Sequence, residues 1–183
     1  MSSTERSVTE MDSSVLNEIA RRAEYPTHRG RLMKSRKVLN LVSAYFWKDS
    51  PVLGLIPKGL PECDYEKWNI GLVNLYSEQK AISAHTDSSA GMVLSSGVYS
   101  VSYGIKDSCP CEDGVVIGSF WLGEKKMEIK SGVPLTFDGY NIKHRASTKK
   151  GFTRINITLR EKEFEIGDEA VETEETDEIE KTD

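Results

Sequence analysis

The feature that most constrains the fold is a succession of short strand-like runs after residue 38. Each run is rich in β-branched and aromatic residues and is broken by Gly, Pro, Asn or Ser. Many short strands, with a last one that returns late in the chain, fit a double-stranded β-helix, the jelly-roll type of barrel. We therefore expect a mainly β domain of this type, with strands over 38–46, 71–76, 81–85, 98–104, 115–122, 126–129, 134–137 and 153–159.

One short helix is expected before the strands. Val15, Ile19 and Ala23 repeat at helical spacing, and Asp12 can cap their N-terminal end, which predicts a helix over 15–23. The length of 183 residues is close to that of a single domain. The predicted organisation is a disordered start over 1–11, one folded domain over 12–160 and a disordered acidic tail over 161–183.

Two histidines and an aspartate form the first candidate site. His85 and Asp87 lie two residues apart, so in a strand both side chains point to one face, and the distant His144 can close the set. Two imidazoles and one carboxylate make a facial triad that binds non-haem Fe(II) and leaves coordination positions open. We predict that these three residues hold the metal and form the catalytic centre, rather than an exposed turn and a surface histidine.

The last strand-like run carries the second candidate site. Arg154, Asn156, Thr158 and Arg160 lie on one face of it, and the apolar residues between them lie on the other. The two arginines are separated by about 20 Å along the strand, and their long side chains can lean together. Because the guanidinium fork suits carboxylates, we expect a small dicarboxylate between them, 2-oxoglutarate.

A third motif extends the pattern and brings in a family resemblance. Asn74 and Tyr76 share a face of the run 71–76. With His85-Thr86-Asp87, His144 and the run from Arg154 to Arg160, the chain resembles the AlkB-like family of Fe(II)/2-oxoglutarate dioxygenases, whose pattern is N-x-Y, H-x-D, a later H and R-x-N-x-x-x-R. The resemblance covers about residues 68 to 160, including the segments 98–104 and 132–139.

This resemblance implies a double-stranded β-helix and an oxidative reaction. It implies that Arg160 and Asn74 hold the 1-carboxylate of 2-oxoglutarate, and that Arg154, Asn156 and Tyr76 hold its far carboxylate. O2 is then consumed, succinate and CO2 form, and a C–H bond of the substrate is hydroxylated. If that carbon is an N-methyl group on a nucleobase, formaldehyde is lost and the bare base remains.

The region 25–48 is basic and aromatic. It holds six Lys or Arg residues and no acid, interleaved with aromatics that include Tyr45 and Trp47. Such a segment can follow phosphates and stack on bases, which favours single-stranded DNA or RNA as partner. By resemblance it corresponds to a nucleotide-recognition lid. The alternative is that Phe46 and Trp47 are core residues and that the lysines form a solvated face.

The segment after the H-x-D motif departs from the family. Many members that demethylate adenine or cytosine carry acids there, and a carboxylate can accept a hydrogen bond from the exocyclic amine. This chain has Ser88-Ser89-Ala90 instead. A hydroxyl both donates and accepts, so we take Ser89 as a candidate substrate residue and leave open another base or a carbonyl edge.

Charge is segregated along the chain. The net charge of −5 combines an acidic tail, with twelve acids and two lysines after residue 160, and a body with 22 basic and 17 acidic residues. The composition of the tail is typical of disorder. The start of the chain lacks a signal peptide, and there is no apolar run of membrane-spanning length. We expect an intracellular protein, cytoplasmic or nuclear, that is not secreted and not bound to a membrane.

Three cysteines argue against a disulfide framework. Cys109 and Cys111 are expected to be a reduced pair in a loop, since their spacing is too tight for an ordinary zinc corner. Two other function classes stay open: the same oxygenase chemistry on a protein or small molecule, and a jelly-roll binding module without catalysis. The intact set of metal ligands and arginines disfavours the second. The oligomeric state does not follow from the sequence.

Overall fold

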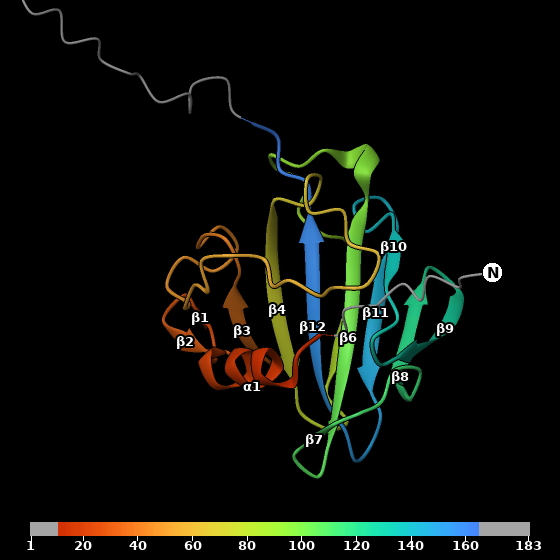
Figure 1. The fold of residues 1–183 in the computed structure, drawn as a ribbon. Coiled ribbons are helices and arrows are strands. Elements are labelled where there is room, and N and C mark those ends of the chain that lie inside the picture. Colours follow the sequence, from red (N-terminus) through yellow and green to blue (C-terminus); the bar gives the residue numbers. More distant parts are fainter. Residues whose placement is uncertain (1–10, 165–183) are drawn as a thin grey trace, which may run out of the picture.

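The computed structural model describes residues 11–164 as a mainly β protein with one α-helix (Figure 1). The predictions for residues 1–10 and 165–183 lie outside these residues. No helix within the described part is long and apolar enough to cross a membrane. The elements in chain order are α1 (Ser13–Arg22), β1 (Thr27–His28), β2 (Arg31–Leu32), β3 (Lys37–Asn40), β4 (Ile70–Tyr76), β5 (Ala81–His85), a 3-10 helix (Leu94–Ser96), β6 (Val98–Lys106), β7 (Cys109–Pro110), β8 (Val116–Leu122), β9 (Lys125–Lys130), β10 (Leu135–Phe137), β11 (His144–Thr148) and β12 (Thr153–Arg160).

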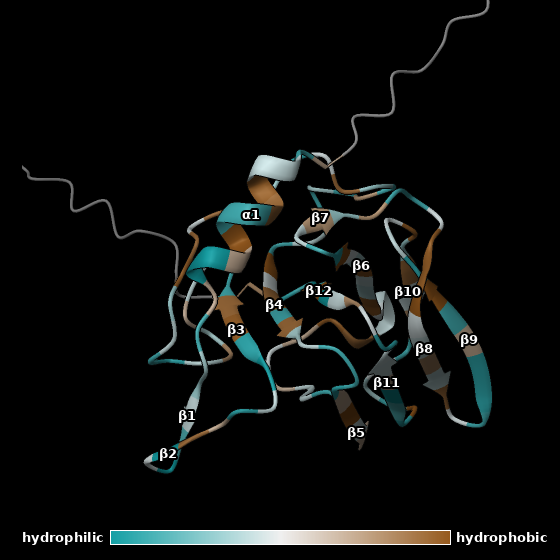
Figure 2. Cartoon of the chain, turned by 90° about the horizontal axis from the view of Figure 1, so that it is seen from below, coloured by the Kyte–Doolittle hydropathy of each residue, from teal (hydrophilic) through white to brown (hydrophobic). Residues whose placement is uncertain are grey.

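The strands form two sheets and a separate hairpin, and the named strands all pair antiparallel. The larger sheet has the order β10-β6-β12-β4-β3, with β7 on the end of β6, and the smaller has the order β5-β11-β8-β9. The pair β1 and β2 stands apart as a hairpin. In Figure 2 the larger sheet separates α1 from β11, β8 and β9. The two sheets therefore face each other, and side chains from both line one cavity.

The helix is set by local signals and by burial. The carboxylate of Asp12 accepts a hydrogen bond from Ser14 N (2.9 Å), which satisfies a free amide of the first turn. Leu16 and Ile19 are buried against the larger sheet, where they join Val73 and Ile155 in the main apolar core. This helix was predicted from the sequence, and it begins two residues earlier than expected.

The alternation along β12 is confirmed. Ile155, Ile157 and Leu159 are fully buried in the core under α1, while the polar residues between them face the cavity. β12 is also the central strand of the larger sheet, paired along its whole length with β4 and β6. One face of this strand therefore builds the core, and the other face builds the floor of the cavity.

The predicted strands are mostly present, with one clear error. The run 38–46 is a strand only as far as Asn40. Asn40 is fully buried, and its side chain donates to Trp47 O (2.8 Å), so it fixes a loop that turns away from the sheet. The strand β11 was missed, as were the two-residue strands β1, β2 and β7. The inward residues of β11 face a polar cavity, so this strand lacks the apolar alternation that marks a half-buried strand.

The end of the domain lies beyond its predicted position. Glu161 and Glu163 were assigned to the tail, but Val93 N donates to Glu161 O (2.9 Å) and Glu163 N donates to Gly91 O (2.8 Å). Lys162 forms an isolated bridge with Met92. Residues 161–163 therefore belong to the folded body and lie beside the loop that follows Asp87.

Candidate active site

His85, Asp87 and His144 are brought together at one end of the cavity. His85 ends β5 and His144 begins β11, and the two residues are direct partners across these antiparallel strands. The Nε2 atoms of His85 and His144 lie 3.4 and 3.5 Å from Asp87 Oδ1. One donor atom from each residue lies within 4.8 Å of the others. Residues 59 positions apart in the chain thus form one potential metal-ligand set because β5 and β11 are neighbours.

Backbone carbonyls set which nitrogen of each imidazole carries a proton. His85 Nδ1 lies 2.8 Å from Ser83 O, and His144 Nδ1 lies 3.1 Å from Ile142 O. A carbonyl only accepts, so both Nδ1 atoms donate and both Nε2 atoms face Asp87, where a protonated Nε2 donates to the carboxylate and a neutral one offers its lone pair to a metal. Ligands of a cation bound at about 2.1 Å and at right angles lie about 3 Å apart. The observed separations are close to this value, so these residues fit a divalent metal.

The position of Asp87 is fixed from several sides. Its amide donates to Gly139 O (2.8 Å), and its Oδ2 pairs with Arg160 Nη2 (2.9 Å). A Cβ at Gly139 would lie 3.0 Å from Oδ2, so a side chain there would press on the carboxylate. Burial opposes ionisation of Asp87, but hydrogen bonds from His144 and His85 and the charge of Arg160 outweigh it and hold the pKa of the carboxyl well below its usual range.

Aromatic rings orient His144. Its ring centroid lies 4.9 Å from that of Phe137 and 6.0 Å from that of Phe120, and its side chain is 7% exposed. His85 is more open, with a side chain that is 33% exposed. The ligand set therefore has a closed side, formed by His144 and its aromatic neighbours, and an open side at His85 through which a substrate can approach.

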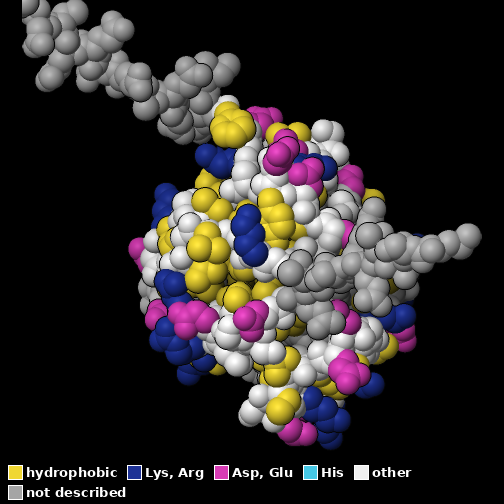
Figure 3. Space-filling model, viewed as in Figure 1, with side chains coloured by type: hydrophobic (Ala, Val, Ile, Leu, Met, Phe, Trp, Pro, Cys, Tyr) yellow, Lys and Arg dark blue, Asp and Glu magenta, His cyan; other side chains and the backbone are white. Residues whose placement is uncertain are grey.

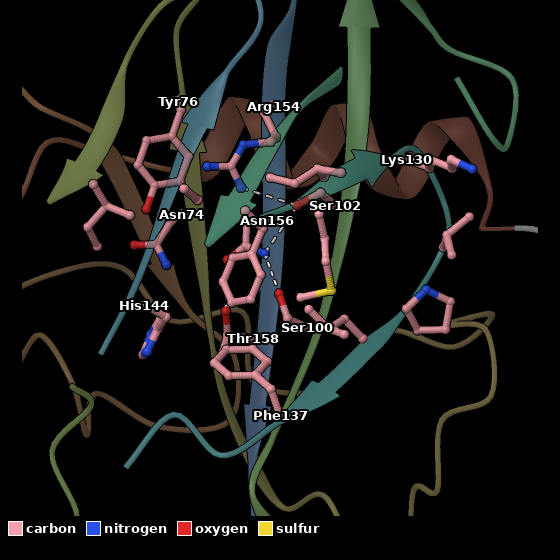
Figure 4. Close-up of a pocket in the computed structure, with 18 of the residues that line it drawn as sticks. Asn74, Tyr76, Ser100, Ser102, Lys130, Phe137, His144, Arg154, Asn156 and Thr158 are labelled. Carbon is pink, nitrogen blue, oxygen red and sulfur yellow. Dashed lines mark hydrogen bonds between the residues drawn. The ribbon is translucent and has the colours of Figure 1, made fainter. Parts of the chain in front are cut away.

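Arg154 occupies the other end of the cavity. Its Nε donates to Thr148 Oγ1 (3.1 Å) and its Nη1 donates to Ser102 Oγ (3.2 Å). Its guanidinium lies 4.4 Å from the centre of the Tyr76 ring, and Figure 4 shows Arg154 beside Tyr76 and Ser102. The residue is 2% exposed, and within residues 11–164 no carboxylate pairs with it. Burial lowers the pKa of the guanidinium. Its Nη2 is buried without a hydrogen-bond partner in the described structure.

A polar network joins the two ends. Asn156 Nδ2 donates to Ser100 Oγ (2.8 Å) and Ser102 Oγ (3.2 Å), and Thr158 Oγ1 donates to Asn156 Oδ1 (2.8 Å) (Figure 4). The amide of Asn156 is therefore already engaged by the protein. Asn74 Oδ1, in contrast, is buried with no partner among the described residues. The cavity of about 220 Å³ is lined by all the predicted metal and cosubstrate residues: Asn74, Tyr76, His85, Asp87, His144, Arg154, Asn156 and Arg160.

The predicted substrate residues lie outside this lining. Tyr45 donates from its hydroxyl to Ala90 O (2.7 Å), beside the exposed Ser89. Trp47 is half-buried, and its backbone is held by Asn40. Phe46, between them, packs on the smaller apolar core and places its ring 4.8 Å from the Arg160 guanidinium. The segment 45–47 thus covers the Arg160 end from outside, and Phe46 has the core role of the alternative interpretation.

Several residues of the site had no sequence signal. Thr148 and Ser102 hold Arg154, and Tyr140 contributes a buried hydroxyl with no partner in the part of the chain described. Burial raises the pKa of Tyr140 to about 12. None of these belongs to a spaced motif, and Thr148 and Ser102 meet Arg154 only because distant strands pack together.

Comparison of the sequence with models of known protein families finds no match, and comparison with curated protein sequences finds none either. The geometry and chemistry of the cavity are therefore the basis for a functional assignment. Cys63, Cys109 and Cys111 are free thiols in the structure and lie outside the cavity lining.

Proposed function

We propose that this protein is an Fe(II)- and 2-oxoglutarate-dependent dioxygenase of the AlkB-like type, built on a double-stranded β-helix, that acts on N-methylated bases in nucleic acid. One observation carries the proposal. A facial set of two imidazoles and one carboxylate lies at one end of a cavity whose other end is a buried arginine that pairs with no carboxylate of residues 11–164. Such a cavity suits a metal and an anion that reaches from it to the arginine.

His85, Asp87 and His144 would hold Fe(II) through two Nε2 atoms and Asp87 Oδ1. When bound, Fe(II) supplies the activation of O2 that is coupled to decarboxylation of 2-oxoglutarate. The overall reaction converts O2, 2-oxoglutarate and an N–CH3 group to succinate, CO2 and N–CH2OH. The cosubstrate and the C–H bond each give two electrons; one oxygen atom of O2 enters succinate and the other enters N–CH2OH, while CO2 comes from the 1-carboxylate of 2-oxoglutarate. The N–CH2OH group then loses formaldehyde and leaves N–H.

The two arginines would have different tasks in this reaction. Arg154, whose Nη2 has no partner among the described residues and whose guanidinium neighbours Tyr76, would bind the far carboxylate of 2-oxoglutarate. Arg160 is paired with Asp87 through Nη2, and its Nε and Nη1 are buried without partners in the described chain. It can therefore keep Asp87 ionised and still donate to the 1-carboxylate. The free Asn74 Oδ1 marks a further polar contact on the same path.

Support for a nucleic-acid substrate comes from the hairpin of β1 and β2. His28, Arg29, Arg31 and Lys34 on and beside it are all exposed. Arg29 and Gly30 turn the chain with positive φ angles of 48° and 74°. Figure 3 shows Lys and Arg side chains along the left edge of the molecule, where this hairpin lies in Figure 1. An exposed cationic hairpin of this kind suits a phosphate backbone.

The test is succinate formation from 2-oxoglutarate by purified protein with Fe(II), alone and with methylated single-stranded oligonucleotides. We expect basal turnover that methylated oligonucleotides stimulate, with release of formaldehyde. His85→Ala and His144→Ala should abolish it, and His28→Ala, which removes the remaining histidine of the chain, should leave basal turnover intact. Absence of turnover in the wild-type protein would refute the proposal. Turnover stimulated by a peptide or metabolite but not by oligonucleotides would leave the oxygenase chemistry and refute the nucleic-acid substrate.

A further inference from the structure

The outer face of the smaller sheet carries a tryptophan between two cationic side chains. The register places Arg145, Trp121 and Lys126 side by side on β11, β8 and β9. The guanidinium carbon of Arg145 lies 3.8 Å from the centre of the Trp121 ring, and Lys126 Nζ lies 5.3 Å from it. Arg145 and Lys126 are exposed, and Trp121 is half-buried. These three residues are called the Trp121 row below.

The Trp121 row lies on the opposite face of the sheet from the cavity. Phe120 and His144 line the cavity, and the alternation of a strand sends their neighbours Trp121 and Arg145 outward. In Figure 2, α1 lies beyond the larger sheet, on the side away from β8, β9 and β11. The α-helix of the described residues therefore covers the larger sheet and leaves this face of the smaller one open.

Along the sheet, the row lies next to the candidate metal ligands. His144 pairs with His85 on one side and with Leu122 on the other, and Leu122 is the last residue of β8 before the turn into β9. Arg145 and Trp121 form the next pair, about 3.3 Å further along the strands. The metal ligands and the Trp121 row therefore lie back to back at the same end of the smaller sheet.

The cations of this face have no carboxylate partners. No ion pair within residues 11–164 includes Arg145, Lys126 or Lys149. Glu128 is the acid of β9, and it pairs in register with Ser119, one step along the face from the row. Three cations against this one acid leave the face positive. Exposed cations that water alone neutralises can exchange this hydration for the phosphates of a polyanion.

A hollow of about 470 Å³ continues the surface beside the row. Its lining combines cations, hydroxyls and an acid, from Lys126, Lys149, Ser119, Ser147 and Glu128. Gly118 forms part of it, and a Cβ at this glycine would overlap Ser147 O, so no side chain can fill the space. Lysines and serine hydroxyls are groups that contact the sugar-phosphate backbone of nucleic acids.

We propose that the Trp121 row and its hollow bind the sugar-phosphate backbone of a single strand whose target base lies in the cavity. This inference rests on the proposed function and gives its nucleic-acid substrate a second contact surface. A guanidinium that lies over an aromatic ring keeps the N–H groups at its edge available to a phosphate. In Figure 2, β5 lies between the β1–β2 hairpin and the strands β8 and β9. A strand can therefore contact both cationic surfaces while one of its bases enters at His85.

The first experiment measures binding of a fluorescent, unmodified strand of about 15 thymidines by anisotropy over a range of salt concentrations. The double variant Arg145→Gln/Lys126→Gln should bind about tenfold more weakly at low salt. The slope of log Kd against log salt should fall by about 1.4, which is about 0.7 for each of two lost phosphate contacts. Trp121→Leu should weaken binding severalfold although it keeps every charge, and Trp121→Phe should restore most of the loss.

The matched control is Lys58→Gln/Lys67→Gln. These lysines also lie over aromatic rings, at 4.4 Å from the centre of the Tyr65 ring and 4.6 Å from that of Trp68. Both rings pack in the main core with α1, away from the smaller sheet. The control removes the same number of charges as the double variant, so its strand affinity and salt slope should stay close to those of the wild type.

The second experiment tests whether the strand on the row is the one that delivers its base to the cavity. With a methylated strand that stimulates succinate formation, Arg145→Gln/Lys126→Gln should raise KM for the strand about tenfold. The kcat and the basal succinate formation without strand should stay within about twofold, because the row does not touch the metal ligands or the cosubstrate site.

Four results would overturn the inference. They are an unchanged salt slope in the double variant, an equal loss in the control, weaker binding without a rise in KM, and displacement of the strand by polyglutamate as readily as by an oligonucleotide of equal charge. The last result would make the face a site for acidic protein segments. Absence of succinate formation in wild-type protein refutes the dioxygenase, whereas the binding results decide the fate of the Trp121 row.

Discussion

The two arginines of β12 lie at opposite ends of one cavity and are buried to a similar degree, 2% exposed for Arg154 and 8% for Arg160. Their partners differ. Arg160 pairs with Asp87 at 2.9 Å, whereas Arg154 has two hydroxyls and an aromatic ring. A buried charge without a counter-charge is costly to fold. A protein keeps such a group where a ligand supplies the missing charge, so the Arg154 end has the features of a binding site and the Arg160 end those of a support for the metal ligands.

The largest effect is expected when the carboxylate that pairs with Arg160 is removed. Asp87→Ala should abolish succinate formation and lower the free energy of unfolding by about 3–5 kcal/mol, because Arg160 is then buried without a counter-charge. Chemical denaturation and a turnover assay measure the two effects. Glu128→Ala, at the other carboxylate of the lining, is the control and should have little effect on either. An Asp87→Ala protein as stable as the wild type would show that the pair with Arg160 contributes nothing to the fold.

Replacing each arginine by methionine tests how the Arg160 end and the Arg154 end of the cavity differ in their contribution to stability. Arg160→Met should lower the free energy of unfolding by about 1–3 kcal/mol, since Asp87 keeps its histidine contacts but loses its strongest counter-charge. Arg154→Met should change it by less than about 1 kcal/mol without ligand, because the lost hydrogen bonds are offset by removal of an uncompensated buried charge. Denaturant titrations of the metal-free proteins provide the measurement. Equal destabilisation by both substitutions would contradict the contrast drawn above.

Ligand binding should change the Arg154 end in the predicted direction. With Fe(II) and no oxygen, 2-oxoglutarate at a hundred times its Kd should stabilise the wild-type protein by about 2.7 kcal/mol. In Arg154→Met the affinity should fall about ten- to hundredfold, so the same concentration should give only about 0.4–1.4 kcal/mol. Thermal or chemical unfolding with and without cosubstrate tests this. Full stabilisation of the variant would place the far carboxylate elsewhere.

The smallest expected effect concerns the support of Arg154. Thr148→Val keeps the shape of the side chain and removes the hydroxyl that accepts from Arg154 Nε. The free energy of unfolding should fall by about 1 kcal/mol, and the affinity for 2-oxoglutarate should weaken severalfold because the guanidinium is less well oriented. Ser147→Ala, the neighbouring residue on the same strand, is the matched control. A Thr148→Val protein with unchanged cosubstrate affinity would show that Arg154 needs no support from β11.

The sequence was sufficient to predict those features that depend on the side-chain pattern of a single strand or helix. The capped helix at Asp12, the strands around Asn74 and His85, and the two faces of β12 all follow from the periodicity of side chains along a single element. The prediction that His85 and Asp87 share one face of a strand is wrong, because β5 ends at His85 and Asp87 lies in the following loop, where its amide donates to Gly139 O. The early end of β3 at Asn40 was not predictable in this way, since a buried side chain that holds a distant loop overrides a strand-like sequence.

The sequence by itself determined which residue types line the larger sheet's side of the cavity, since alternation along β4 and β12 puts polar groups on inward faces. Only the tertiary structure decided that Arg160, and not Arg154, pairs with Asp87, and where Tyr45, Trp47 and Ser89 lie. These depend on the register of β5 against β11 and on loops that cross from one sheet to the other. Such contacts join residues far apart in the chain, and their energies depend on burial and charge pairing that no local period records.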